Sequence, residues 1–227
     1  MRFLPALFAG LFLAAAPAAL AAAPGTESAS AENASLAGQY MLMGVREAAA
    51  GLELLGDGRF RYGLSYGALD EQAEGNWRRE GNRILLTTSP EPRPPEWTLA
   101  ETEKGEPKQF ALLLEGANGR PIRDVEVELR LSDGSIVEAR TGTDWLEAPL
   151  EAGAVPVAVR FRIPLFDARS PEFAVDLAKG HRLRFRLDPR DLGTRDFRDW
   201  PLEIREGALV PPGAPEGQDF RKVRVDD

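Results

Sequence analysis

The chain contains no cysteine and a single histidine, His181, among its 227 residues. The absence of cysteine excludes disulfide bonds, thiolate catalysis and zinc sites with cysteine ligands. A single histidine also excludes a metal site built from several imidazoles. We therefore expect no metal or other cofactor, and we expect burial of apolar side chains alone to stabilise the fold.

Lysine is scarce as well, whereas arginine is abundant, a bias typical of a GC-rich bacterial genome. The net charge is -8. An acidic chain is a poor general binder of nucleic acid, so we expect no nucleic-acid partner. The few lysines are Lys104, Lys108, Lys179 and Lys222.

Only one long apolar run is present, and it lies at the start of the chain. Arg2 precedes the apolar residues from Phe3 to Leu20, and Ala19-Leu20-Ala21 has the small-x-small pattern of a cleavage site. These features predict a cleaved signal peptide over residues 1–21 and a periplasmic or secreted protein. The cleavage site lacks the cysteine of a bacterial lipoprotein. No later run is long enough to span a membrane, so we expect no transmembrane segment in the mature chain.

The first ordered unit is predicted over residues 38–89, after a disordered lead-in over residues 22–37. Apolar residues alternate with polar ones from Arg59 to Tyr66, which is typical of a strand with one buried face. Asp57-Gly58 and Gly81-Asn82 lie between such runs and predict hairpins. We expect an antiparallel meander or half-barrel of about five strands. A unit of this size buries little surface alone, so it should pack on the rest of the chain or close on itself.

Residues 90–108 are expected to be a stiff, extended linker, because they begin with the proline-rich run from Pro90 to Pro95. The alternative is that this run is a proline-motif ligand for a peptide-recognition domain.

Residues 109–210 repeat short alternating runs separated by Gly, Pro and Asp, which predicts a β-sandwich or barrel-like domain. Residues 211–227 are predicted to form a loose tail. The predicted class is all-β, with helix only in short pieces such as 47–50 and 189–192.

Two stretches carry resemblances to known families. Asp57-Gly58-Arg59-Phe60 and Gly75-x-Trp77 resemble small secreted bacterial all-β modules and the half-barrels of calycin-like proteins. The run from Gly119 to Leu129, with Thr141-x-Thr143-Asp144, resembles the carboxypeptidase-regulatory-like β-sandwich, although Trp145 stands where that family usually has glycine. The first resemblance implies a fold, and the second implies an accessory, non-catalytic role.

Five arginines occupy the outward positions of two predicted strands. If the strands are neighbours, these side chains form a basic stripe that could bind an anionic glycan, a lipid surface or an envelope protein. The alternative is cross-strand pairing with Glu126 and Glu128. The five residues are Arg160, Arg162, Arg182, Arg184 and Arg186.

Gly63-Leu64-Ser65-Tyr66-Gly67 matches the G-x-S-x-G pattern of a serine hydrolase, and His181 follows in the order of a triad. That chemistry needs the serine on a sharp turn between a strand and a helix. Here Ser65 continues an alternating strand and no helix is predicted after it. We therefore interpret the motif as a strand with permissive glycines, and His181 as a histidine at a strand end.

Two groups of acidic residues also invite a functional interpretation. Asp188, Asp191, Asp196 and Asp199 could hold calcium, but arginines interleave with them and favour salt-bridged loops. Paired carboxylates can hydrolyse glycosides when a fixed distance separates them. A hydrolase would be favoured if one cleft brought together Asp57, Asp70, Glu71 and Glu74.

The four tryptophans could form a stacking platform for sugars. Trp77 follows the core pattern of the meander, and we expect the others, Trp97, Trp145 and Trp200, to plug the ends of the sandwich. No catalytic set is apparent, so the leading hypothesis is a non-enzymatic binding or envelope-associated module. A hydrolase that uses carboxylates and a structural subunit of an envelope assembly are the alternatives.

Overall fold

The computed structural model describes residues 34–106, 109–148 and 150–223. The predicted signal peptide and most of the predicted lead-in lie outside these residues. The all-β prediction is confirmed, because strands make up 52% of the chain and helix 3%. The part of the chain that the structure describes holds no helix with the length and apolar composition of a membrane span.

Eight strands form a closed barrel in which every neighbouring pair is antiparallel. Around the barrel they are β1 (Gly38–Leu42), β17 (Phe220–Lys222), β16 (Ala208–Val210), β15 (Trp200–Arg205), β5 (Arg83–Thr88), β4 (Leu69–Glu80), β3 (Arg59–Tyr66) and β2 (Ala48–Leu54). The predicted five-strand meander corresponds to β1 to β5.

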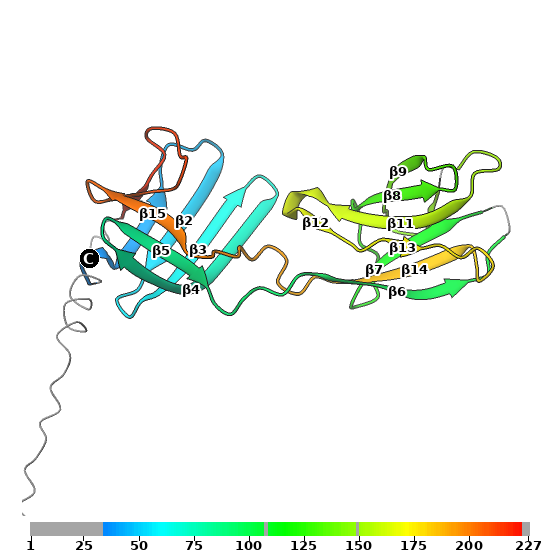
Figure 1. Cartoon of the computed structure of the whole chain (residues 1–227), viewed down its shortest axis with the longest axis horizontal. Helices are drawn as coiled ribbons and strands as arrows, with labels where there is room; N and C mark the ends of the chain where they lie inside the picture. The colour runs from blue at the N-terminus through cyan, green and yellow to red at the C-terminus, as the bar shows by residue number, and fades with distance from the viewer. Residues whose placement is uncertain (1–33, 107–108, 149, 224–227) are drawn as a thin grey trace, which may run out of the picture.

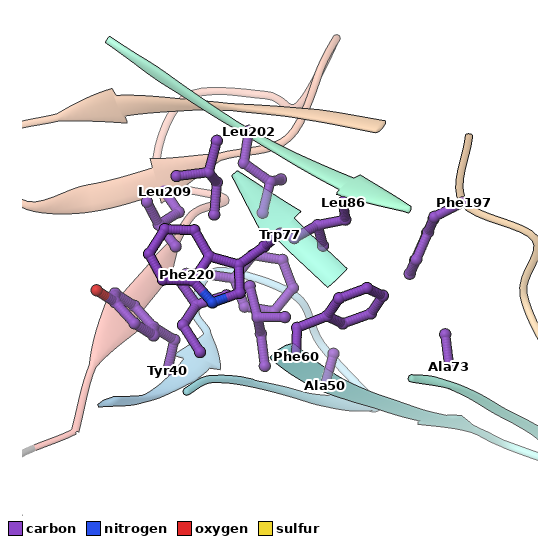
Figure 2. Packing of buried hydrophobic residues seen from close by; sticks show 13 residues of the cluster. Tyr40, Ala50, Phe60, Ala73, Trp77, Leu86, Phe197, Leu202, Leu209 and Phe220 are labelled. Atoms are coloured by element: carbon purple, nitrogen blue, oxygen red, sulfur yellow. The ribbon is translucent and has the colours of Figure 1, made fainter. Parts of the chain in front are cut away.

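The barrel is filled by its own side chains. Along β3 and β4 the inward positions carry Phe60, Ala73 and Trp77, all at most 5% exposed, and the outward positions carry polar residues. Figure 2 shows Phe60 and Trp77 packed together with Phe220 in the centre of the barrel. Trp77 Nε1 donates to the carbonyl oxygen of Leu55 at 2.9 Å, so the buried indole N–H is satisfied.

The three strands that close the barrel come from the end of the chain, which corrects the predicted domain boundaries. β15 and β16 lie in the barrel rather than in a sandwich over 109–210, and β17 lies within the predicted loose tail of 211–227. The physical reason is that β1 and β5 would otherwise leave unpaired backbone groups on both edges of the meander. An alternating pattern identifies a strand but not the sheet that it joins.

The remaining strands form a β-sandwich that is inserted between β5 and β15. One sheet has the order β10-β7-β14-β6 and the other has the order β12-β11-β8-β9, with β13 paired to β11. Only the β7–β14 pair is parallel among the named strands. The bounds are β6 (Glu96–Glu103), β7 (Ala111–Gly116), β8 (Glu126–Leu131), β9 (Ile136–Arg140), β10 (Leu146–Glu147), β11 (Pro156–Ile163), β12 (Ala168–Arg169), β13 (Phe173–Ala174) and β14 (Arg182–Asp188).

The sandwich has a hydrophobic core separate from that of the barrel. At its centre Trp97 stacks on Phe161 with ring centroids 5.7 Å apart, and Phe161 meets Phe185 edge to face. Trp97 belongs to β6, a strand that lies inside the predicted linker of 90–108. The predicted linker is therefore limited to the proline-rich residues before Glu96.

Two chain segments join the units, and Figure 1 shows them crossing side by side between the barrel and the sandwich. We call residues 89–95 the first connector and residues 189–199 the second connector.

The helices predicted at 47–50 and 189–192 are not found. Ala48 opens β2, and residues 190–193 form turns. Pairing with β3 overrides the helical preference of the alanines. Within the described ranges, helical conformation is confined to residues 34–36 and to the 3-10 turn η1 (Pro164–Phe166).

Candidate functional site

A surface recess lies where the connectors meet the barrel. It arises because β4 is longer than its neighbour β5. The two strands pair only as far as Gly75 and Thr88. A side chain at residue 75 would meet the carbonyl oxygen of Thr87 at 2.1 Å, so Gly75 permits a close approach just before the chains separate.

The second connector takes over the wall of the barrel where β5 ends. The amide of Gln72 donates to the carbonyl oxygen of Gly193 at 3.0 Å. The amide of Arg195 donates in turn to the carbonyl oxygen of Gln72 at 2.8 Å. The hydroxyl of Thr88 donates to the carbonyl oxygen of Arg195 and accepts from the amide of Phe197. Buried polar groups are thus paired on both sides of the junction.

Phe197 anchors this segment in the barrel core. Its ring is 4% exposed, stacks on Trp200 at 4.7 Å and meets Tyr62 edge to face at 5.2 Å. Close beside it, Arg195 contacts the carboxylate of Glu71 at 3.4 Å. The second connector is therefore built into the barrel and is more than a tether to the sandwich.

A recess of about 520 Å³ remains between the two connectors and strands β3 and β4. We call it the junction groove. Its volume falls within the range of small-ligand sites, and a junction between two packed units is a common place for such a site. It is lined by Arg61, Tyr62, Gln72, Ala73, Glu74, Thr88, Pro90, Pro92, Asp191 and Thr194.

An ion pair holds the two connectors together at the groove. The amide and Nε of Arg93 both donate to Oδ2 of Asp191, at 2.8 and 3.1 Å. The side-chain and backbone hydrogen bonds from Arg93 hold the pKa of Asp191 below its ordinary value. Arg198 adds a second link, with Nη2 2.7 Å from Glu91. These contacts position the groove lining.

Tyr62 lines the groove and carries a hydroxyl group. Burial raises the pKa of Tyr62, and the negative charge of Glu71 raises it further. The hydroxyl therefore stays protonated at physiological pH and remains available as a hydrogen-bond donor.

The predicted arginine stripe does not form as one face. Arg160 and Arg162 lie on β11, whereas Arg182, Arg184 and Arg186 lie on β14 in the other sheet. The two strands are not neighbours, so the condition for a continuous basic stripe is not met. The reason is topological, since β11 pairs with β8 and β14 pairs with β6 and β7.

Carboxylates accompany most of these arginines. Arg162 contacts Glu128 at 3.0 Å and Glu126 at 3.9 Å, the cross-strand pairing that was the alternative interpretation. On the other sheet, Arg184 contacts three carboxylates, those of Glu101, Glu103 and Glu115.

The other arginines of the set are held in different ways. Arg160 reaches Glu172 at 3.8 Å. The guanidinium of Arg182 lies 4.0 Å from the ring centre of Trp145. Within the described residues Arg186 alone of the five makes no ion pair or ring contact.

The hydrolase motif and the acidic sets do not converge. Ser65 lies within β3 and donates to Asp70, which sits opposite it on β4, while His181 lies in the sandwich just before β14. Of the four carboxylates considered for a hydrolase, only Glu74 lines the junction groove. Asp57 binds Arg59 in the β2–β3 turn, and Glu71 faces Arg195.

Of the four aspartates, Asp196 pairs with an interleaved arginine, Arg198, while Asp191 pairs with Arg93 and Asp199 with Arg78. Asp188, the last residue of β14, accepts from the backbone amide of Arg190. Arginine pairing is therefore found, as the salt-bridge interpretation predicted, but mostly with arginines outside this group. Among the described residues no group of three potential ligands is arranged to hold a metal ion.

The tryptophans are dispersed. Trp77 fills the barrel and Trp97 fills the sandwich, while Trp145 lies beneath Arg182. Trp200 packs at the barrel against Phe197, so the prediction that it plugs the sandwich is wrong. No shared stacking platform results.

The junction groove was missed by the sequence reasoning because its lining comes from four separate segments. Two signals were present, namely Gly75 opposite the end of β5 and the prolines at 90 and 92. Comparison of the chain with protein-family models, with curated proteins and with solved structures finds no match. The calycin-like and carboxypeptidase-regulatory-like resemblances therefore stay predictions.

Proposed function

We propose that this protein is a non-enzymatic binding module of the bacterial envelope, acting in the periplasm or outside the cell. The junction groove is the single observation that carries the proposal. It is open, its lining is fixed by hydrogen bonds and ion pairs, and it lies at the boundary of two packed units. Sites that bind small ligands are usually formed in advance in this way.

The groove is a better candidate than the arginine faces. Arg162 and Arg184 are already engaged by carboxylates, so an anionic partner would have to displace those groups. Lining groups of the groove such as Gln72 and Thr194, in contrast, have side chains that no other residue engages within the described chain. An unengaged polar group is available to a ligand without the loss of an existing contact.

A pull-down from a native envelope extract tests the binding role. The tagged mature protein should capture a specific protein or glycan, identified by mass spectrometry. The double variant Gln72→Ala/Glu74→Ala should lose that capture, whereas Asn76→Ala, on the outward face of the same strand but outside the groove, should retain it. Equal capture by all three proteins would contradict binding through the groove.

Export is tested separately by fractionation of cells that express the full chain. The sequence pattern predicts a mature protein that begins at Ala22 and is found in the periplasm or the medium. Intact chain retained in the cytoplasm would contradict this part of the proposal.

A further inference from the structure

The junction groove presents several hydrogen-bonding side chains that have no partner within the described residues. They combine two hydroxyl groups, a carboxamide and a carboxylate, which together supply both donors and acceptors. They belong to β3, β4 and the second connector, and all of them line one recess of about 520 Å³. The four residues are Tyr62, Gln72, Glu74 and Thr194.

The charges that line the groove disfavour an anionic ligand. Arg61 is paired with Glu53 at 3.1 Å, and Asp191 is paired with Arg93. Glu74 makes no ion pair within the described chain, so the unpaired charge in the groove is negative. An anionic polymer or lipid headgroup would meet this carboxylate directly.

The backbone of the groove disfavours an extended peptide. Strand addition needs a free edge with unpaired amides and carbonyls. Here the edge of β4 is occupied, because Gln72 bonds to both Gly193 and Arg195, and the carbonyl oxygen of Glu74 accepts from Ser89 at 3.0 Å.

Apolar faces are nevertheless present beside the polar groups. Pro90 is exposed and Pro92 is half-buried, and both line the groove together with the half-buried ring of Tyr62. Flat apolar faces next to amide, carboxylate and hydroxyl groups match a sugar ring, which has apolar C–H faces and a rim of hydroxyls. A carboxamide and a carboxylate each have two polar atoms that can contact neighbouring hydroxyls.

We propose that the junction groove binds a short saccharide that is uncharged or carries an amine, and that it rejects acidic saccharides. This inference rests on the proposed binding function and specifies its ligand class. Gln72 and Glu74 bind the hydroxyls or the amine, Tyr62 donates a further hydrogen bond, and Pro90 and Pro92 pack against a ring face.

Isothermal titration calorimetry of the full mature protein tests the ligand class. The probes are maltotriose, tri-N-acetylchitotriose, the trimer of glucosamine and, as the acidic counterpart, trigalacturonate. We expect at least one of the first three to bind, and trigalacturonate not to bind. Gln72→Ala should weaken binding about tenfold, as expected for the loss of hydrogen bonds. Tyr62→Phe, which keeps the ring, should weaken it less, and Asn76→Ala should leave it unchanged.

The possible outcomes separate this inference from the proposed function. Envelope capture that depends on Gln72 and Glu74, without binding of any of the three sugars, would overturn the saccharide assignment and leave the binding function standing. Preferential binding of trigalacturonate, or of a peptide from the captured material, would overturn it as well. If capture is also independent of the groove, both proposals fail.

Discussion

The barrel and the sandwich differ in how the chain supplies their strands. The sandwich is built from one continuous segment, β6 to β14, whereas the barrel combines β1 to β5 with β15 to β17 from the other end of the chain. Each has its own buried core. The barrel therefore begins nearer the start of the chain, yet it cannot close until β17 is available. Its contacts are therefore the more non-local of the two, which favours slower folding.

The same difference places the junction groove. Inserting the sandwich between β5 and β15 forces two connectors to pass the end of β5, and one of them replaces the missing wall of the barrel. A continuous barrel would have no such junction. The groove is thus a direct consequence of the insertion.

Removal of β15 to β17 should have the largest effect. A chain that ends at residue 199 leaves β1 and β5 without their neighbours and removes Leu202, Leu209 and Phe220 from the core. We expect the amides of β2 to β5 to lose protection from hydrogen exchange while those of β8 and β11 keep theirs. A chain shortened only by residues 224–227 is the control. Retained protection in β3 and β4 of the shorter chain would contradict the composite barrel.

Matched core substitutions should separate the two units. Trp77→Ala in the barrel and Phe161→Ala in the sandwich each remove a buried aromatic ring and should each cost about 3–5 kcal/mol. Because the cores are separate, we expect each change to lower the unfolding midpoint of its own unit far more than that of the other. Denaturant titration followed by NMR signals from each unit measures this. Equal destabilisation of both units by either variant would show that they unfold as one.

Thr88→Val tests the seam between the barrel and the second connector. Valine keeps the shape but removes the hydroxyl that bonds to Arg195 and Phe197, both in a buried site. We expect a loss of about 1–3 kcal/mol from the barrel and faster hydrogen exchange at residues 195–197. Thr98→Val, at an exposed position of β6, is the control and should change stability by less than about 0.5 kcal/mol. Unchanged exchange at residues 195–197 would show that the seam does not hold the connector.

Titration of Asp191 should reveal the smallest effect. The pKa of Asp191 is lowered from 3.8 chiefly by the side-chain hydrogen bond from Arg93. A lowered pKa in the folded state means that this contribution to stability is complete above the ordinary value and is lost as the pH falls through the lowered one. Arg93→Gln should move the pKa of Asp191 back toward 3.8, as followed by NMR of its carboxyl carbon.

Asp133 in the sandwich provides the comparison for that titration. Its pKa is lowered by Ser135, which does not depend on Arg93. We expect the pKa of Asp133 to be the same in both proteins. An unchanged pKa of Asp191 in Arg93→Gln would show that the ion pair does not form in solution.

Local patterns were enough to predict the strands but not their partners. The alternation from Phe60 to Tyr66 and the glycines at 58 and 81 led to the correct hairpins, because strand period and turn conformation are local properties. That Trp200 joins the barrel depends on pairing with Leu86, more than a hundred residues earlier. Such pairing is decided by the whole fold.

The candidate site was harder to predict from the sequence than the strands were. The arginines on β11 and β14 share an alternating pattern, yet their strands lie in different sheets, so the pattern could not indicate one surface. The groove lining includes Tyr62, Glu74 and Thr194, which no local motif connects. Only the path of the connectors brings them together.

The most direct test of the account is hydrogen-exchange mass spectrometry of the mature protein with and without a digest of native envelope. Binding through the junction groove predicts new protection confined to residues 61–74, 88–92 and 191–194, which carry the groove lining. The variant Gln72→Ala/Glu74→Ala should lose this protection. Protection of β11 or β14 instead, around Arg160 or Arg186, would contradict the account. It would show that the partner binds at the arginine-bearing strands.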